Sequence, residues 1–111
     1  MIAQYGAIST HAISSGGNST ETFSHTVSAG SNRLLLVGTS NDLSTAHVVS
    51  SVAFNGVALT NIISSGDSNK LVELWGLVAP VVQTANIVIT YDGAVKGGSW
   101  AITYRDRKSV V

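Results

Sequence analysis

The sequence contains no cysteine and only one proline, and charged residues amount to just 11% of it. Without cysteine, neither a disulfide framework nor a cysteine-ligated zinc site can form. The six basic residues make no run that could follow a phosphate backbone, so we expect no nucleic-acid binding. Neither a phosphate-binding loop nor a dinucleotide fingerprint is present, and we expect no cofactor.

Long apolar runs are missing as well. No stretch reaches the roughly 18 apolar residues of a membrane-spanning helix, and we expect no membrane span. The first residues lack the basic start and apolar run of a secretory signal. If the protein is secreted, its signal lies outside this sequence.

What the sequence does contain is 44% hydrophobic residues, together with many small polar residues and no net charge. High apolar content at zero net charge argues against disorder. Small polar residues mixed with β-branched ones are typical of short strands joined by tight turns. With 111 residues, the chain is one small domain at most.

The spacing of apolar residues indicates strands. No window of ten to twelve residues has helical spacing, whereas alternating or short continuous apolar runs recur. In residues 20–27, Phe23, His25 and Val27 alternate with hydroxyl residues. The centre of residues 33–39 is apolar on both faces, which predicts a central strand covered on both sides. Further strands are predicted at residues 2–8, 70–79, 85–91 and 99–104, and loops or bends at residues 14–19, 29–32, 64–69, 92–93 and 97–98.

The sharpest local prediction is a hairpin over residues 51–59. Asn55 and Gly56 accept the positive φ angles of a type I′ turn at low cost. A two-residue loop pairs the residues on either side and places the apolar ones on one face. These apolar residues are Val52, Phe54, Val57 and Leu59. Seven or eight short strands in all predict an antiparallel β-sandwich, with jelly-roll and immunoglobulin-like topologies both open.

The last six residues, 106–111, break the composition of the rest. They match the translation of GAT CGG AAG AGC GTC GTG, which resembles an adapter used in short-read DNA sequencing. We therefore expect a natural domain over residues 1–105 that is truncated at its C-terminus, followed by a non-native tail. Missing strands would leave a sheet edge unpaired and open to self-association.

Three stretches together resemble a known kind of module. They are residues 27–38, 52–60 and 72–80, which contain Ser-Asn-Arg-Leu-Leu, Gly-Val-Ala-Leu and Glu-Leu-Trp. In order and spacing they are similar to β-sandwich modules of large secreted bacterial proteins and phage structural proteins. The resemblance implies an extracellular or virion-surface location and other domains of the same parent chain as partners. It supplies no catalytic residue.

Catalytic and metal-binding patterns are weak. His11, His25 and His47 lie on different predicted segments and no Gly-x-Ser-x-Gly elbow occurs, so we expect no enzyme activity. The oxygen-rich residues 41–42 and 67–69 each offer a single carboxylate. Turn chemistry is therefore favoured over calcium binding at both, and no metal site is predicted.

The aromatic residues, 6% of the chain, supply the one candidate binding site. Sugar-binding sandwiches commonly present aromatic faces beside amides and carboxylates. Trp75 beside Glu73, or Trp100 with Tyr104, would make such a glycan platform. Core packing is the competing and favoured role for both tryptophans.

The leading expectation is a non-catalytic structural or adhesive module of a larger extracellular or virion-surface protein. The alternative is a carbohydrate-binding module attached to a secreted hydrolase, which an exposed tryptophan on a sheet face would support. A fragment of an enzyme would need a histidine, a serine and a carboxylate converging in a cleft.

Overall fold

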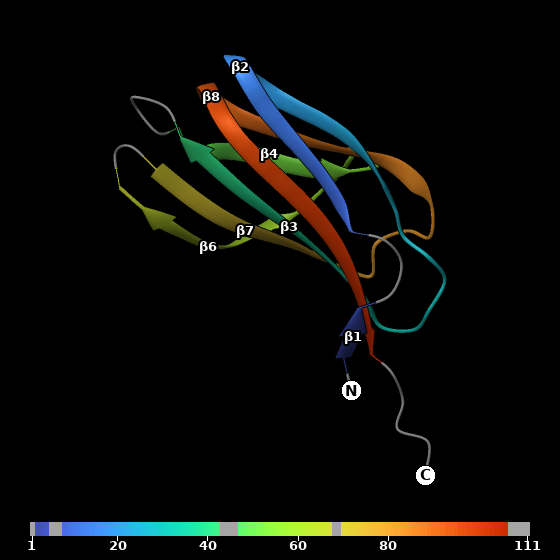
Figure 1. The fold of residues 1–111 in the computed structure, drawn as a ribbon. Coiled ribbons are helices and arrows are strands. Elements are labelled where there is room, and N and C mark those ends of the chain that lie inside the picture. Colours follow the sequence, from blue (N-terminus) through green and yellow to red (C-terminus); the bar gives the residue numbers. More distant parts are fainter. Residues whose placement is uncertain (1, 5–7, 43–46, 68–69, 107–111) are drawn as a thin grey trace.

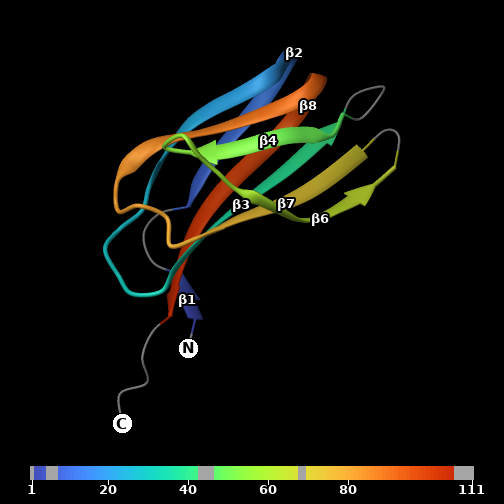
Figure 2. The same cartoon turned by 180° about the vertical axis from the view of Figure 1, so that it is seen from behind.

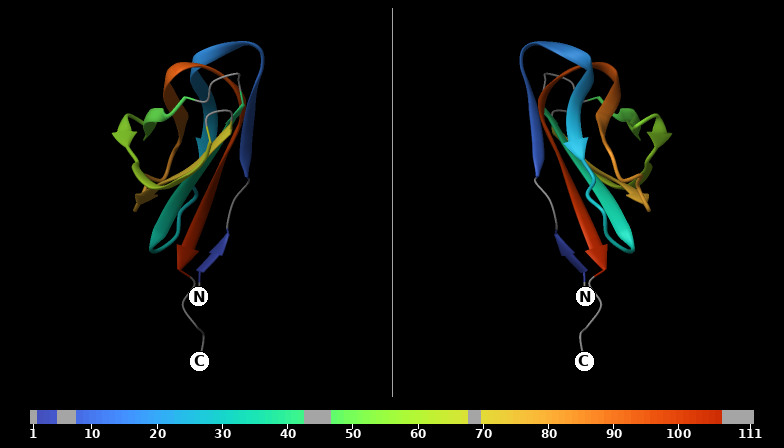
Figure 3. Two further views of the ribbon diagram at one scale, coloured as in Figure 1. Left: turned by 90° about the vertical axis from the view of Figure 1, so that its left-hand side faces the viewer. Right: turned by 90° about the vertical axis from the view of Figure 1, so that its right-hand side faces the viewer.

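Antiparallel strands make up the fold in a computed structural model, which describes residues 2–4, 8–42, 47–67 and 70–106. Within these residues the strands are β1 (Ile2–Gln4), β2 (Ser9–Thr26), β3 (Arg33–Asp42), β4 (Val49–Phe54), β5 (Val57–Ala58), β6 (Thr60–Gly66), β7 (Lys70–Val78) and β8 (Thr84–Asp106). The strand order is β5-β4-β8-β3-β7-β6, and β1 and β2 also pair with β8. The sheet curls into a nearly closed barrel (Figure 1 and Figure 3).

The all-β, antiparallel class is thereby confirmed, while the sandwich topologies are not established. The described residues form no helix that is long and apolar enough to cross a membrane. Of the predicted tail, only the backbone of Asp106 is described, opposite Ile2. Residues 107–111 lie outside the described residues, as do residues 5–7 of the first predicted strand and residues 68–69 of a predicted loop.

Strand β8 organises the barrel because it is 23 residues long and pairs with β1, β2, β3 and β4. Its first part, residues 84–91, pairs with β2 and β4, and its second part, residues 97–105, pairs with β2 and β3. Strand β2 follows β8 over most of its length (Figure 1). Strands β2 and β8 therefore belong to both walls of the barrel, one of which contains β4 and the other β3.

Several predicted loops are strand instead. Residues 14–19 lie within β2, residues 92–98 lie within β8, and β6 extends to Gly66. The pairing of β2 with β8 shifts register between residues 13 and 20, which marks a bend. A Cβ at Gly97 would overlap a backbone oxygen of β3, so glycine is needed for that close approach. The bend predicted as one of two possibilities at residues 97–98 is confirmed, whereas the loop predicted at residues 14–19 is wrong, because that segment continues the paired strand.

The core fills the barrel interior. The alternation predicted for residues 20–27 is confirmed, because Phe23, His25 and Val27 are buried while the residues between them are exposed. The largest fully buried apolar side chains come from both walls. They are Val27, Leu35, Val37, Val52, Phe54, Ile87, Ile89 and Val95.

The hairpin of residues 51–59, which joins β4 to β5, has the predicted register. Asn55 and Gly56 take φ angles of 51° and 76°, as a type I′ turn requires. The Leu59 amide donates a hydrogen bond to the Val52 carbonyl (2.8 Å), and both side chains are buried. Val57 stays half exposed at the hairpin tip, unlike the three other apolar residues of this hairpin.

Strand β3 is central, as predicted, since it lies between β7 and β8. Its inward residues Leu35 and Val37 are fully buried, whereas Leu34 and Leu36 point outward and are only partly covered. The prediction that both faces are covered is therefore wrong for the outer face. The physical reason is that a curled sheet closes its concave face on itself and leaves its convex face open.

Candidate functional site

A row of polar side chains crosses the barrel interior. Ser99 of β8 lies opposite Thr39 of β3, and Thr39 lies opposite Glu73 of β7. Directly paired residues point to the same side of a sheet, and all three side chains enter the barrel. None is more than 4% exposed. Buried polar groups of this kind either stabilise the fold through hydrogen bonds or form a site.

Glu21 lies at the centre of a polar cluster formed with His11, Tyr91 and Ser99. Its Oε1 accepts hydrogen bonds from the Tyr91 hydroxyl and from Ser99 Oγ (2.7 Å), and its Oε2 lies 2.8 Å from His11 Nδ1. These partners replace the hydration that Glu21 loses at 1% exposure. Burial and the adjacent Glu21 carboxylate raise the pKa of Tyr91, which keeps its hydroxyl protonated and able to donate.

His11 is the member of the polar cluster that solvent reaches. Its side chain is 36% exposed, and its ring stacks on Phe23 with the centroids 5.6 Å apart. A serine, a histidine and a carboxylate do converge here, but Glu21 lies between Ser99 and His11. A hydrolytic triad needs the histidine between the other two, so that it can deprotonate the serine. The geometry therefore lacks the order of groups that nucleophilic catalysis requires.

His25 makes a second serine–histidine contact. Its Nδ1 lies 2.7 Å from Ser9 Oγ, and its Nε2 lies 2.8 Å from Thr103 Oγ1. Thr103 thus occupies the position where a triad has its carboxylate, and a neutral hydroxyl cannot stabilise an imidazolium in the same way. Burial lowers the pKa of His25 and favours the neutral ring. This arrangement links β2 to β8 through hydrogen bonds.

Protein groups already engage both oxygens of the Glu73 carboxylate. Its Oε2 accepts a hydrogen bond from the Val49 amide (2.7 Å), and its Oε1 accepts from Ser64 Oγ (2.9 Å) and Asn61 Nδ2 (3.3 Å). The carboxylate thereby joins β7 to β4 and β6. Glu73 and the neighbouring Trp75 are 3% and 9% exposed, so this half of the predicted glycan platform lies inside the barrel.

The oxygen-rich segments use their side chains for turn chemistry, as predicted. The Asn41 amide group bonds the backbone carbonyl and amide of His47 (2.9 and 3.3 Å), and Asp67 Oδ1 accepts from a backbone amide three residues on (3.1 Å). The Asp42 side chain and residues 68–69 lie outside what the structure describes. Among the described residues, no three histidine, aspartate or glutamate side chains gather to hold a metal ion.

The convex side of the sheet carries an outer apolar face. It consists of Trp100 and the largely covered Ile102 from β8, Leu34 and Leu36 from β3, Val72, Leu74 and Val78 from β7, and Ile62 and Ile63 from β6. Ile63 is 58% exposed, Val72 54% and Trp100 40%. Tyr104, the partner of Trp100 in the predicted platform, lies on the same face, since it is four residues along the same strand. Strand β6 ends this side of the sheet (Figure 2).

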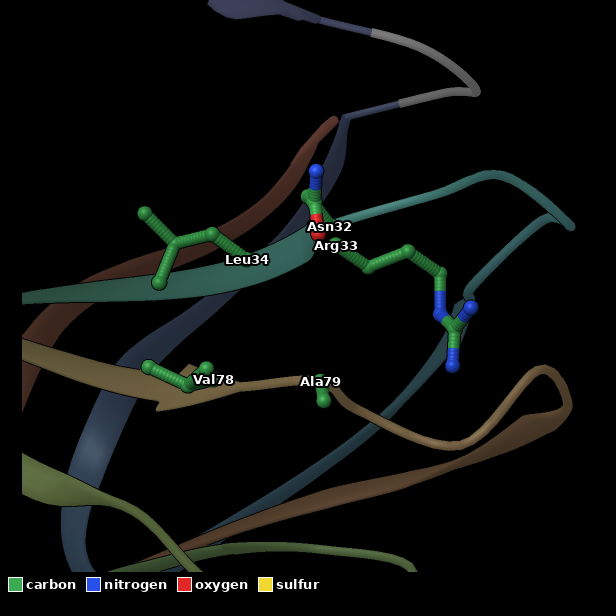
Figure 4. Close-up of a pocket in the computed structure, with 5 residues that line it drawn as sticks. All are labelled: Asn32, Arg33, Leu34, Val78 and Ala79. Carbon is green, nitrogen blue, oxygen red and sulfur yellow. The ribbon is translucent and has the colours of Figure 1, made fainter. Parts of the chain in front are cut away.

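A hollow of about 340 Å³ lies at the end of the outer apolar face. Its lining residues are Asn32, Arg33, Leu34, Val78 and Ala79 (Figure 4). The Arg33 guanidinium donates hydrogen bonds to the carbonyls of Pro80 (2.9 Å) and Gly30 (2.7 Å). The arginine therefore fixes two loops, and the aliphatic side chains of the hollow continue the apolar face.

Neither the buried position of Glu21 nor the strand that carries Ile62 and Ile63 was predicted from the sequence. Glu21 shares the parity of Phe23 and His25, so extending that alternation by one step would have placed it inside. Ile62 and Ile63 stood in no predicted element. Two consecutive β-branched residues followed by hydroxyl residues favour a strand, and this pattern could have predicted β6.

Comparison with protein-family models, with curated proteins and with solved structures finds no match to this chain. No function is carried over from a relative. The polar cluster and the outer apolar face are therefore the features from which a function has to be argued.

Proposed function

We propose that this chain is a non-catalytic structural module that packs against another protein surface through its outer apolar face, within a larger extracellular or virion-surface assembly. One observation carries the proposal, namely that this face is apolar and open. Ile62, Ile63 and Val72 are each more than half exposed. Contiguous apolar surface on a soluble protein usually marks an interaction site, because exposing it to water is unfavourable.

The interior supports the same proposal. The carboxylates of Glu21 and Glu73 have hydrogen-bond partners within the protein on both of their oxygens. A catalytic carboxylate has to reach its substrate, whereas neither of these two is more than 3% exposed. These side chains instead hold facing walls of the barrel together, which suits a module that bears load or positions neighbours.

Dye binding tests whether the outer apolar face is an open surface. A fluorescent dye that reports exposed apolar surface should bind the folded protein, and Ile63→Lys should weaken that binding strongly. Because Ile63 is 58% exposed, the substitution should change the free energy of unfolding by only about 0.5 kcal/mol. Val57→Lys, at a side chain 50% exposed on another strand, is the matched control and should keep dye binding. Equal dye binding by wild type and Ile63→Lys would contradict the proposal.

A carbohydrate-binding module is the second candidate, and Trp100 is the observation that favours it. Its indole lies on a sheet face at 40% exposure, with Tyr104 on the same face. In a Trp75→Phe protein, oligosaccharides that bind should shift the fluorescence of Trp100 saturably. Trp100→Ala should abolish the binding. A flat titration across a panel of polysaccharide fragments would remove this candidate.

A further inference from the structure

We infer that the occupant of the outer apolar face is a second copy of this chain, packed face to face about a twofold axis. The inference rests on the proposed function and adds the identity of the partner. Most soluble oligomers are homo-oligomers of this symmetry, in which one patch contacts its own image. A patch can contact its own image in this way when it is smooth, uncharged and large enough to hold two copies together.

The outer apolar face is smooth because two glycines lie beneath its largest side chains. A Cβ at Gly38 would overlap the indole of Trp100, and a Cβ at Gly76 would lie 2.9 Å from Ile62 Cδ1. The tryptophan and the isoleucine therefore lie down across the neighbouring strands instead of projecting. A surface without projections meets its own image without steric clash.

A β-bulge extends the same face to the edge of the sheet. Asn61 pairs with Trp75 and Ile63 pairs with Leu74, so Ile62 is an extra residue between the two pairs. Ile63 shares the outward side with Leu74, and Ile62 lies over Gly76 on that side as well. Two consecutive isoleucines therefore face outward, where a regular strand would turn one of them inward.

The chemistry of the face suits an identical partner. On β3, β7 and β8, the described outward residues between the Ser40–Val72 pair and the Leu34–Val78 pair include no charged side chain. A charged partner would find no counter-charge there, whereas apolar surface matches apolar surface. The formal net charge of the chain is zero, so two copies approach without long-range repulsion.

The size of the face predicts a reversible dimer. It spans four strands, β8, β3, β7 and β6, which at a strand spacing of about 4.8 Å gives a width of about 19 Å. Seven residues of β7 add a length of about 20 Å, so two copies would cover about 760 Å². That area is smaller than a standard specific interface and is typical of weak, transient contacts. Because the barrel also curves away at its sides, we expect weak association, with a dissociation constant on the order of 100 μM.

Sedimentation velocity on the full chain tests the inference directly. From low micromolar to several hundred micromolar protein, wild type should shift from monomer to dimer. Ile63→Lys would place an unpaired ammonium group in the interface and should weaken association at least about tenfold. Val72→Lys, on β7, should act in the same way if Ile63→Lys fails to fold. Val57→Lys is again the control and should dimerise like wild type.

Each outcome has a separate meaning. Dimerisation that a folded face variant weakens at least about tenfold and that the control keeps supports the inference. A monomer at every concentration that still binds the apolar dye overturns the second copy but leaves the proposed function, with another protein as the partner. A monomer without dye binding overturns both. A dimer that neither face variant weakens uses another surface, and the inference is then wrong.

Discussion

Gly38 shows how a single residue shapes the outer apolar face. The Trp100 indole occupies the space that a side chain at this position would fill. We predict that Gly38→Ala displaces the indole, changes its fluorescence and costs about 1–3 kcal/mol of unfolding free energy. Gly98→Ala on β8 is the matched control, because its Cβ would meet only the His11 carbonyl at an ordinary 3.6 Å. Equal effects in the two variants would contradict this role of Gly38.

Replacing two buried threonines should change the free energy of unfolding in opposite directions. Thr39 Oγ1 has no hydrogen-bond partner among the described residues, whereas Thr103 Oγ1 bonds His25. Thr39→Val should raise the free energy of unfolding by about 1 kcal/mol, because it removes an unsatisfied hydroxyl. Thr103→Val should lower it by about 1–3 kcal/mol, because it leaves the histidine nitrogen without a partner. Denaturant unfolding of the pair measures both, and destabilisation by Thr39→Val would show that its hydroxyl is satisfied.

Tyr91 makes stability depend on pH in alkaline solution. Its pKa is raised in the folded state, so the folded protein keeps a proton that the unfolded chain releases above about pH 10. The contribution of Tyr91 to the free energy of unfolding is therefore fully present below pH 10. It falls as the pH rises, by up to about 1.4 kcal/mol per pH unit. Tyr91→Phe should flatten this slope in urea unfolding between pH 9 and 11. Parallel slopes for the two proteins would rule out Tyr91 as the cause.

At the scale of elements, local patterns predicted the strands that have regular registers. The hairpin of residues 51–59 combined a turn type with a matching apolar pattern, and both were right apart from the exposure of Val57. Strands β2 and β8 were divided wrongly because their middle parts are rich in glycine and serine. Composition alone does not distinguish a loop from a bend in a paired strand, since both require small residues.

The hairpin turn allows a test of backbone strain without side-chain clash. At Gly56, φ is 76° and no atom lies within 4 Å of an added Cβ. Gly56→Ala should therefore cost about 1–2 kcal/mol, all of it from the left-handed backbone. Asn55→Gly should cost less than about 1 kcal/mol, because glycine adopts the 51° angle freely and only the long, exposed hydrogen bonds between Asn55 and Gln83 (3.3 and 3.4 Å) are lost. Thermal unfolding of both variants provides the measurement, and a neutral Gly56→Ala would mean that the turn rearranges.

For the whole molecule, closure of the barrel lies beyond what local patterns specify. Ser99 and Glu21 are 78 residues apart in sequence but bond at 2.7 Å, and Tyr91 reaches the same carboxylate over 70 residues. Such pairs depend on the bend of β2 and β8, which no short window contains. The outer apolar face was partly visible in the continuous apolar run of β3, but which side of that run stays open depends on the direction in which the sheet curls.

The central claim is that the outer apolar face is an open docking surface and not part of the core. The most direct test is acrylamide quenching of Trp100 in a Trp75→Phe protein, measured over a range of protein concentrations. We predict efficient quenching in dilute solution, because Trp100 is 40% exposed, and progressive protection as association covers the face. Weak quenching at every concentration, equal to that of Trp75 in a Trp100→Phe protein, would show a covered indole and contradict the claim.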